Sequence, residues 1–223
     1  MNFELLREDA KVTQASDLWI LSRLQETVKR ATAEFEKFEY AKAREAIEEF
    51  FWRDFCDNYL EICKVRSYGL AAEKLVGTKL SDLQKAEIQA KQQSAIKALE
   101  ICLNTILKLF APFIPHICDE IYSALFAEEF TKTQSINARG NWPKLDEKFF
   151  DQSLIEDGKL LLEVIFEVRK FKSEKNISMK TTVEKVRVAR VVGIEKFVED
   201  LANVCNAKKI ELIAEEKLVE VII

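Results

Sequence analysis

The chain has 223 residues, of which 48% are hydrophobic and 32% charged, a composition typical of globular proteins and unlike that of disordered ones. Its 5 glycines and 3 prolines are too few for a turn-rich β-protein and favour long helices. The net charge of −4 excludes no partner, because a local patch can differ in charge from the whole chain. No apolar run approaches the ~18 residues of a membrane span, and the opening MNFELLREDAKVTQ lacks the regions of a secretory signal, so we expect a soluble, cytoplasmic protein.

Two helices are predicted in the first third of the chain. Ser16 is expected to be the N-cap of the first one. Apolar residues then recur at spacings of three and four, which is one stripe along a helix: Leu21, Leu24, Val28, Ala31 and Phe35. The second helix is predicted from about 39 to 66, because it begins with the good helix formers of AKAREAIEEF and becomes aromatic in its middle.

Two further helices follow a connection that is predicted over 67–79. Ser81 is expected to cap the third helix, which must end at Ala111 because Pro112 lacks an N–H and restricts the residue before it. Pro115 suits the first turn of a fourth helix. The residues of this helix that are expected to face inward are Ile117, Ile121 and Leu125. The four helices together predict a bundle with antiparallel neighbours.

The pattern becomes polar at about residue 131. A long connection is predicted over 131–150, and Trp142 is expected to pack it onto the bundle, together with Phe149 and Phe150. A fifth helix is predicted over 152–174. The residues expected on its apolar side are Leu161, Ile165, Val168 and Phe171.

After the fifth helix the apolar period shortens to two, which predicts a strand. The valines that carry this period are Val183, Val186, Val188 and Val191. A short helix over 194–203 and two short strands, KKIELI and KLVEVII, complete the pattern. We therefore predict a mainly α fold, an antiparallel helical bundle followed by a small α+β C-terminal domain. The expected division is 1–150 for the bundle with its trailing connection and 151–223 for the linking helix and the small domain.

The usual residues of an active site or a metal site are absent from the sequence. The 5 cysteines are scattered singly, without a CxxC pair, so they are expected to be reduced thiols and not metal ligands. No glycine-rich phosphate loop is present, because no two of the five glycines lie within six residues of each other. His116 is the only histidine, and at the start of a helix it is expected to have a structural or capping role. The chain is therefore expected to bind and not to catalyse.

The aromatic and acidic segment FFWRDFCDNYLE, in the second helix, is the first candidate for a binding surface. At 100° per residue one polar ridge is predicted along it, formed by Asp54, Asp57, Asn58 and Glu61. The ridge could belong to a buried ion network, for example through a pair between Arg53 and Asp57. It could equally present donors and acceptors to unstacked bases, with aromatic rings nearby for stacking.

The second candidate is a basic run near the end of the chain. Between Arg169 and Arg190 eight basic residues stand against two glutamates, a local charge of +6 in a chain of net −4. Such a run is often a solvated face. At a helix end followed by a loop, it would also suit a phosphate backbone.

Three segments resemble the anticodon-binding domain of class I aminoacyl-tRNA synthetases, and most closely that of the valyl enzymes. They are WILSRL from Trp19, FFWRDFCDNYLE from Phe50 and LKLFAPFIPHICDEIY from Leu107. The later FEVRKFKSEKNISMKTTVEKVRV is similar to the segment that comes after the bundle in valyl enzymes. The resemblance runs from about 15 to 190. Its valyl character depends mainly on DFCDNYLE.

The resemblance implies a parent enzyme that uses ATP and Mg²⁺ to activate valine and esterify it to tRNA(Val). The catalytic motifs of class I, His-Ile-Gly-His and Lys-Met-Ser-Lys-Ser, are not in this sequence, so it is expected to be a C-terminal fragment without a cofactor. An upstream helix with a Trp-Asn pair and a C-terminal coiled coil, both known in the family, are expected to lie outside it. The expected partners are tRNA(Val) and the catalytic domain of the same parent chain, in a protein that is likewise expected to be monomeric.

Positions within the matched motifs imply which side chains face the tRNA. Polar side chains of the bundle are expected to read splayed anticodon bases, and lysines and arginines of the later helix to hold phosphates. The first group comprises Arg23, Arg53, Asp57, Asn58 and Lys64. The second comprises Arg169, Lys170, Lys172 and Lys175.

Two alternatives remain open at the level of sequence. The fragment could come from an isoleucyl, leucyl or methionyl enzyme, in which case tRNA(Val) would not be preferred. It could also be a helical protein–protein interaction module, which would show no salt-dependent binding of RNA.

Overall fold

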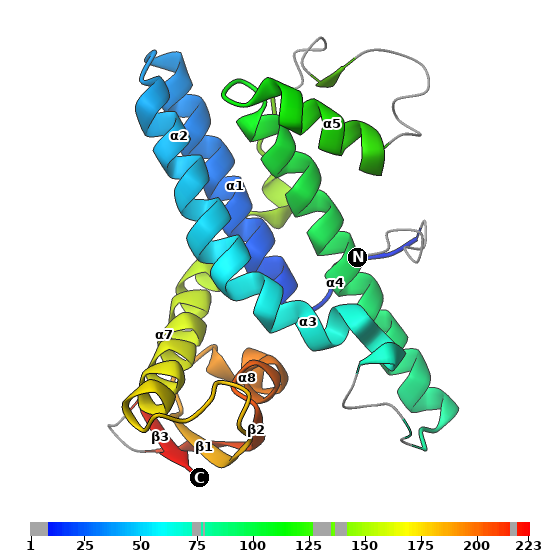
Figure 1. Cartoon of the computed structure of the whole chain (residues 1–223), viewed down its shortest axis with the longest axis vertical. Helices are drawn as coiled ribbons and strands as arrows, with labels where there is room; N and C mark the ends of the chain where they lie inside the picture. The colour runs from blue at the N-terminus through cyan, green and yellow to red at the C-terminus, as the bar shows by residue number, and fades with distance from the viewer. Residues whose placement is uncertain (1–8, 73–76, 78, 127–134, 137–141, 215–217) are drawn as a thin grey trace.

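A computed structural model describes residues 9–72, 77, 79–126, 135–136, 142–214 and 218–223. Helix α1 (Ala15–Glu36) lies beside α2 (Tyr40–Glu49), which continues without a break into the π-helix η2 (Phe50–Tyr59) and then α3 (Leu60–Tyr68) (Figure 1). The predicted stripe of α1 is confirmed, since Leu21, Leu24 and Val28 are buried.

The start of α1 differs from the sequence-based expectation. The helix begins at Ala15 with Gln14 as the N-cap residue, and Ser16 is already inside the helix and buried. Ser16 donates its hydroxyl hydrogen bond to Asp200, near the other end of the chain. The expectation that Ser16 is the N-cap was therefore wrong. A capping hydroxyl accepts a hydrogen bond from a backbone N–H in the first turn, whereas the Ser16 hydroxyl bonds to a side chain that is distant in sequence.

Helix α4 (Asp82–Phe110) follows a short 3₁₀ turn, η3 (Gly69–Ala71), and its boundaries agree with the sequence. Ser81 caps it through a reciprocal capping box with Gln84. Ala111 follows its last residue, and Pro115 occupies the first turn of α5 (Pro115–Leu125), both as predicted. Helix α5 lies across the end of α4 (Figure 1).

Of the three residues expected on the inward face of α5, Ile121 is partly buried against the cluster with α4, as predicted, and the other two are not. Ile117 and Leu125 are 51% and 43% exposed. Cys118 and Tyr122 are buried instead, against Leu107 and Ala111 of α4 and its end. Helix α5 has two apolar stripes, and periodicity alone does not tell which one faces its neighbour.

Trp142 fixes the described part of the predicted connection over 131–150, as expected. Its ring packs edge-on against Phe35 at 4.6 Å, and its indole N–H donates to the Thr32 hydroxyl of α1 at 2.8 Å. The 3₁₀ turn η6 (Glu147–Phe149) then leads into α7 (Gln152–Glu174), the fifth predicted helix. Positions 131–134 and 137–141 of the predicted connection lie outside the described residues.

The C-terminal unit is a small sheet with one crossover. Strand β1 (Val183–Ala189) is central, parallel to β2 (Ala207–Ile213) and antiparallel to β3 (Val219–Ile222). The 3₁₀ turn η7 (Ile194–Phe197) and α8 (Val198–Val204) form the connection that a parallel pair needs. The predicted mainly α fold with a small α+β C-terminal part is confirmed, although Val191 lies beyond the end of β1.

One hydrophobic core joins the bundle to the C-terminal unit, with Trp19, Val168 and Phe197 all in the same cluster. Helix α7 crosses α1 closely because Gly158 faces the Trp19 ring, where an added Cβ would lie 2.0 Å from ring atoms. Figure 1 shows α7 leading from the bundle down to the sheet, with α3 above α8. These contacts hold α3, α7 and the C-terminal unit in fixed positions around a groove.

Candidate nucleic-acid interface

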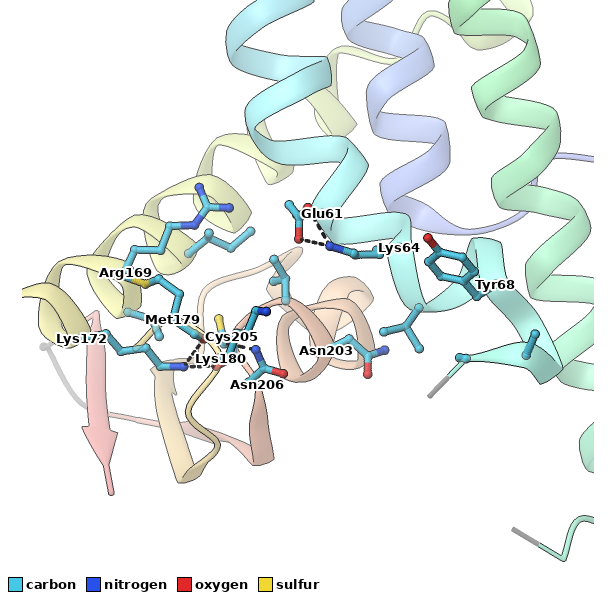
Figure 2. A pocket seen from close by; sticks show the side chains of 16 residues that line it. Glu61, Lys64, Tyr68, Arg169, Lys172, Met179, Lys180, Asn203, Cys205 and Asn206 are labelled. Atoms are coloured by element: carbon cyan, nitrogen blue, oxygen red, sulfur yellow. Dashed lines mark hydrogen bonds and ion pairs between the residues drawn. The ribbon is translucent and has the colours of Figure 1, made fainter. Parts of the chain in front are cut away.

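A groove of about 960 Å³ lies between α3, α7 and the C-terminal unit, and we call it the α3–α7 groove. Figure 2 shows its walls. Helix α3 contributes Lys64 and Tyr68, and α7 contributes Arg169. Lys180, from the turn before β1, and Asn206, after α8, come from the C-terminal unit. The groove therefore joins residues that are far apart in sequence.

Three of the predicted site residues meet at one edge of this groove. Arg169 donates from Nη1 to Asn58 Oδ1 at 3.0 Å and from Nη2 to the Asp57 carbonyl at 3.3 Å. Asn58 in turn donates from Nδ2 to the Arg53 carbonyl, five residues earlier, at 2.8 Å. The wider turn of the π-helix brings that carbonyl within reach of the amide. Arg169 is thus held in a fixed orientation by η2.

The groove combines cations with an exposed aromatic ring. Tyr68 is 58% exposed and lies one helical turn after Lys64, so both side chains point to the same side of α3. Lys64 pairs with Glu61 at 3.0 Å on the surface, and Lys180 is exposed. A ring beside ammonium groups offers a stacking surface for an unpaired base and charge for the adjacent phosphates.

Lys172 has a different role from the phosphate contact that the sequence implied. It is 2% exposed, and its ammonium donates to the carbonyls of Met179, Thr181 and Cys205 at 3.1, 2.7 and 2.9 Å. Burial lowers the pKa of Lys172. All three N–H bonds therefore point inward, and the side chain joins α7 to the turn before β1 and to the end of α8.

The side chains of Arg23 and Arg53 do not line the α3–α7 groove and instead gather around Asp54. Arg23 Nε and Arg53 Nε donate to the two carboxylate oxygens of Asp54 at 2.9 and 3.1 Å, and Asp54 is buried. Arg53 also pairs with Glu49 at 2.8 Å, and Glu49 with Arg30 at 2.8 Å. Burial lowers the pKa of Arg53, but Asp54 and Glu49 outweigh it and leave that pKa above its ordinary value.

The predicted polar ridge is consequently divided. The ion network exists, but Arg53 pairs with Asp54 and Glu49 and not with Asp57. Asp54 is buried, whereas Asp57 and Glu61 are exposed. The plot at 100° per residue fails here because the residues from Phe50 to Tyr59 form a π-helix, in which each turn holds more residues.

The basic run is also divided by the structure. Lys170 is exposed near the end of α7 and Lys175 is exposed directly after it, and neither lines the α3–α7 groove. Arg187, on the central strand, is bracketed by Glu211 and Glu220 of the flanking strands at 3.3 and 3.0 Å. The part of the basic run that lies on β1 is therefore offset by glutamates of the neighbouring strands.

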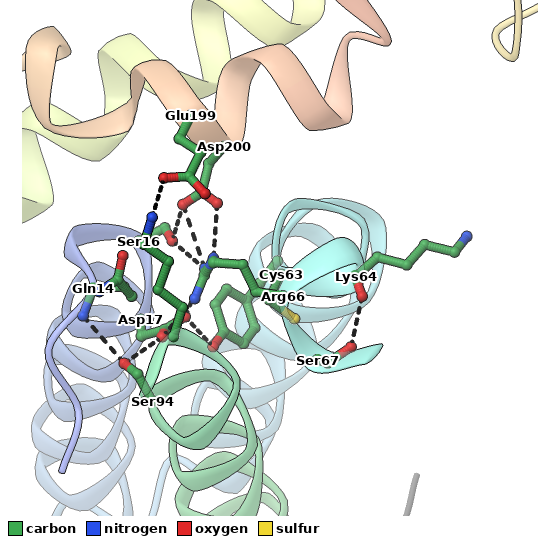
Figure 3. A network of polar contacts seen from close by, with 12 residues as sticks. Gln14, Ser16, Asp17, Cys63, Lys64, Arg66, Ser67, Ser94, Glu199 and Asp200 are labelled. Atoms are coloured by element: carbon green, nitrogen blue, oxygen red, sulfur yellow. Dashed lines mark hydrogen bonds and ion pairs between the residues drawn. The ribbon is translucent and has the colours of Figure 1, made fainter. Parts of the chain in front are cut away.

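Sequence reasoning missed a buried network around Arg66 that ties α3 to α1 and α8 (Figure 3). The guanidinium donates to Asp17 through Nη1 at 2.7 Å and to Asp200 through Nε at 2.8 Å. Burial lowers the pKa of Arg66, but the attraction of Asp17 and Asp200 outweighs it and raises that pKa overall. Burial raises the pKa of Asp200 by more than Arg66 lowers it.

Asp17 is the centre of the same network. Besides Arg66, it accepts hydrogen bonds from the hydroxyls of Tyr59 and Ser94, at 2.8 and 2.7 Å. Tyr59 lies on η2 and Ser94 on α4, so Asp17 and Arg66 together join α1, η2, α3, α4 and α8. The signal available in the sequence was Arg66 four residues after Ile62, on the inward stripe of an apolar helix.

The described residues hold no group of three or more His, Cys, Asp or Glu side chains placed to bind a metal ion. His116 is exposed in the first turn of α5. No helix in the described part of the chain is both long and apolar enough to cross a membrane.

Comparison with known proteins identifies a matching family and several relatives of similar sequence. Residues 17–188 match the family model described as the anticodon-binding domain of tRNA ligase. The chain is 39% identical over 204 residues to a valine–tRNA ligase of Wolbachia sp. subsp. Brugia malayi, covering 90% of this chain and 22% of the relative. It is 38% identical to that of Rickettsia conorii, over 93% and 23%, and 35% identical to that of Ehrlichia canis, over 88% and 22%. The chain thus spans about a fifth of the length of these relatives.

Proposed function

This chain belongs to the family of anticodon-binding domains of tRNA ligases, and from that membership we propose that it is the tRNA-binding portion of a valine–tRNA ligase. The observation that carries the proposal is the α3–α7 groove. It brings the exposed ring of Tyr68 into one groove with Lys64, Arg169 and Lys180, in a chain whose overall charge is negative. We assign 1–150 to the bundle and 151–223 to the linking helix and C-terminal domain.

The groove would divide the contacts with the anticodon loop between two kinds of side chain. Tyr68 offers a face on which one splayed base stacks, and the Asn203 and Asn206 amides can hydrogen-bond base edges. Lys64 and Lys180 would neutralise neighbouring phosphates. Arg169 is oriented by Asn58, so less conformational entropy is lost when it contacts RNA.

We propose that chemistry belongs to another region of the parent protein. There, valine would be activated with ATP and Mg²⁺ and esterified to tRNA(Val). This portion would hold the anticodon side of the tRNA, so that its acceptor end reaches that region. Alone, as a cytoplasmic monomer, it would bind tRNA and aminoacylate none.

The choice of valine is supported by the names of the relatives, since those at 35–39% identity are valine–tRNA ligases. An isoleucyl, leucyl or methionyl fragment would bind its own tRNA in preference. A protein–protein interaction module would lack RNA binding that weakens with salt.

The test is a comparison of tRNA(Val) with tRNA(Ile) by fluorescence anisotropy at several salt concentrations. We expect tighter binding of tRNA(Val), and about a tenfold loss in Tyr68→Ala, since stacking of one base contributes about 1–3 kcal/mol. Tyr40→Ala, an exposed tyrosine outside the groove, is the matched control. Equal affinity for both tRNAs would contradict the proposed preference for tRNA(Val). An unchanged affinity in Tyr68→Ala would contradict the proposed binding of tRNA in the α3–α7 groove.

A further inference from the structure

A second groove, of about 1010 Å³, lies on another part of the bundle, and none of its described lining residues lines the α3–α7 groove. One wall is the second half of α4, and the other is the segment 142–149, shortly before α7. The lead-in to α1 closes one end with Ala10 and Lys11. We call this the lysine groove.

Lysines line both walls of this groove. Lys97 and Lys108 come from α4, Lys144 and Lys148 from the opposite segment, and Lys11 from the lead-in. Among the residues that the structure describes, a single carboxylate, Asp146, lines it as well. The concentration of positive charge stands out in a chain of net charge −4 and indicates an anionic partner.

Three of the five lysines already have a partner: the Lys108 ammonium lies 5.7 Å from the centre of the Tyr122 ring, and two others form ion pairs. Lys97 pairs with Glu100 at 2.6 Å, and Lys148 with Asp146 at 2.8 Å. Lys11 and Lys144 are exposed, and neither has an ion-pair partner within the described part of the chain. The Lys148–Asp146 pair is exposed, and such a pair contributes only about 0–1 kcal/mol, so an incoming polyanion can displace it.

The shape of the groove favours an extended anion over a small one. Lys97 and Lys108 stand eleven residues apart on one helix, which separates them by about 16 Å along the axis at about 1.5 Å per residue. A stacked nucleic-acid strand rises about 3.4 Å per nucleotide, so this distance corresponds to about five nucleotides. Asn104 and Thr105 lie between the two lysines and can bind sugar hydroxyls.

The aromatic side chains of the groove are not available for stacking. The Trp142 ring packs against Phe35, and its N–H already donates to Thr32. The Lys148 ammonium lies over the Phe149 ring at 4.7 Å from its centre. Without an open ring, the groove offers contacts to phosphates and sugars but not to bases.

The opposite wall is also fixed before any ligand binds. The Asp146 backbone N–H donates to Gln25 Oε1 of α1 at 2.7 Å, which holds the segment carrying Lys144 and Lys148 against the bundle. A pre-formed wall reduces the entropy lost on binding.

We propose that the lysine groove binds a stretch of the phosphodiester backbone of the same tRNA, without regard to its sequence. The inference rests on the proposed function, which supplies the RNA. It assigns a second contact that stabilises the complex and orients the tRNA, while the choice between tRNAs stays with the α3–α7 groove.

The experiment measures binding of tRNA(Val) and tRNA(Ile) to the full chain carrying Lys11→Glu/Lys144→Glu. We expect both tRNAs to bind about tenfold or more weakly. The plot of log affinity against log salt should become shallower by about 1 or more per lysine, because each lysine that contacts a phosphate releases counterions. The control is Lys42→Glu/Lys85→Glu, which changes the net charge equally at exposed lysines outside both grooves.

A third variant, Lys64→Glu/Lys180→Glu, separates this inference from the proposed function. If it weakens binding while Lys11→Glu/Lys144→Glu matches the control, the lysine groove does not contact RNA and the proposed function stands. A loss confined to one tRNA would contradict a backbone contact. If the unmodified chain binds neither tRNA, the proposed function and the lysine groove both fall.

Discussion

Lys172 is the residue whose role changes most between sequence and structure. The sequence placed it among lysines expected to face phosphates, because position in a basic run does not indicate which side chain turns inward. In the structure its ammonium satisfies three backbone carbonyls beneath the α3–α7 groove. Buried carbonyls that lose their donors are costly, so the position should be sensitive to substitution.

We expect Lys172→Met to lower the free energy of unfolding by about 2–4 kcal/mol, because it leaves three carbonyls without a donor while preserving side-chain volume. Urea unfolding followed by circular dichroism measures the change. Lys175→Met, three residues later and exposed, is the control and should stay within about 0.5 kcal/mol of the unmodified chain. Equal stability of the two variants would contradict the assigned role.

The buried thiol of Cys205 leads to a prediction about the stability of the chain at alkaline pH. Burial raises the pKa of its thiol to about 12. The thiol of an unfolded chain has a pKa of about 8.5. The contribution of the neutral, buried Cys205 thiol to stability is therefore complete below that pH, and it is lost at about 1.4 kcal/mol per pH unit as the pH rises toward the folded-state pKa. Burial raises the pKa of Cys63 and Cys102 in the same direction. Between pH 9 and 10.5, the free energy of unfolding in urea should therefore fall less steeply with pH in Cys205→Ala than in the unmodified chain. The difference in slope should be about 1.4 kcal/mol per pH unit, which corresponds to one proton. Parallel curves would contradict this.

At the scale of elements, the sequence located most helices and strands because local signals mark their ends. The capping box at Ser81 and the proline at Pro115 act within one turn, and both were confirmed. The inward face of α5 and the π-helix η2 were not predictable in the same way. Both depend on how a helix meets its neighbours, and a fixed angle of 100° per residue carries no information about that.

The close crossing of α1 and α7 can be tested at Gly158. We expect Gly158→Ala to lower the free energy of unfolding by about 1–3 kcal/mol, although alanine is the better helix former, because its Cβ would overlap the buried Trp19 ring. In a double-mutant cycle, Trp19→Phe should recover part of that loss by providing space. Strictly additive effects of the two substitutions, measured by urea unfolding, would contradict the contact.

At the scale of the whole molecule, the bundle and the C-terminal unit are joined by Arg66. Its partners Asp17 and Asp200 lie 49 and 134 residues away, a separation that periodicity in a single sequence cannot reveal. The same limit applies to the site. Positions within the family motifs selected Asp57, Asn58 and Arg169, which the structure brings together. They did not indicate that the side chains of Arg23 and Arg53 pair with Asp54 and do not line the groove.

Arg66→Met should lower the free energy of unfolding by about 3–5 kcal/mol, because it leaves two buried carboxylates without a cation. Arg66→Lys keeps the charge but cannot bridge both carboxylates, and an intermediate loss is expected. Chemical denaturation of the three proteins measures the order. A loss below about 1 kcal/mol in Arg66→Met would mean that the network does not join the two parts.

The most direct test of the central claim, that the α3–α7 groove binds tRNA, is the salt dependence of tRNA(Val) affinity in Lys64→Glu/Lys180→Glu. We expect the slope of log affinity against log salt to become shallower by about 1 or more per lysine, with affinity falling at least tenfold, relative to the unmodified chain. The Lys42→Glu/Lys85→Glu control should keep nearly the original slope. An unchanged slope and affinity in Lys64→Glu/Lys180→Glu would contradict the claim.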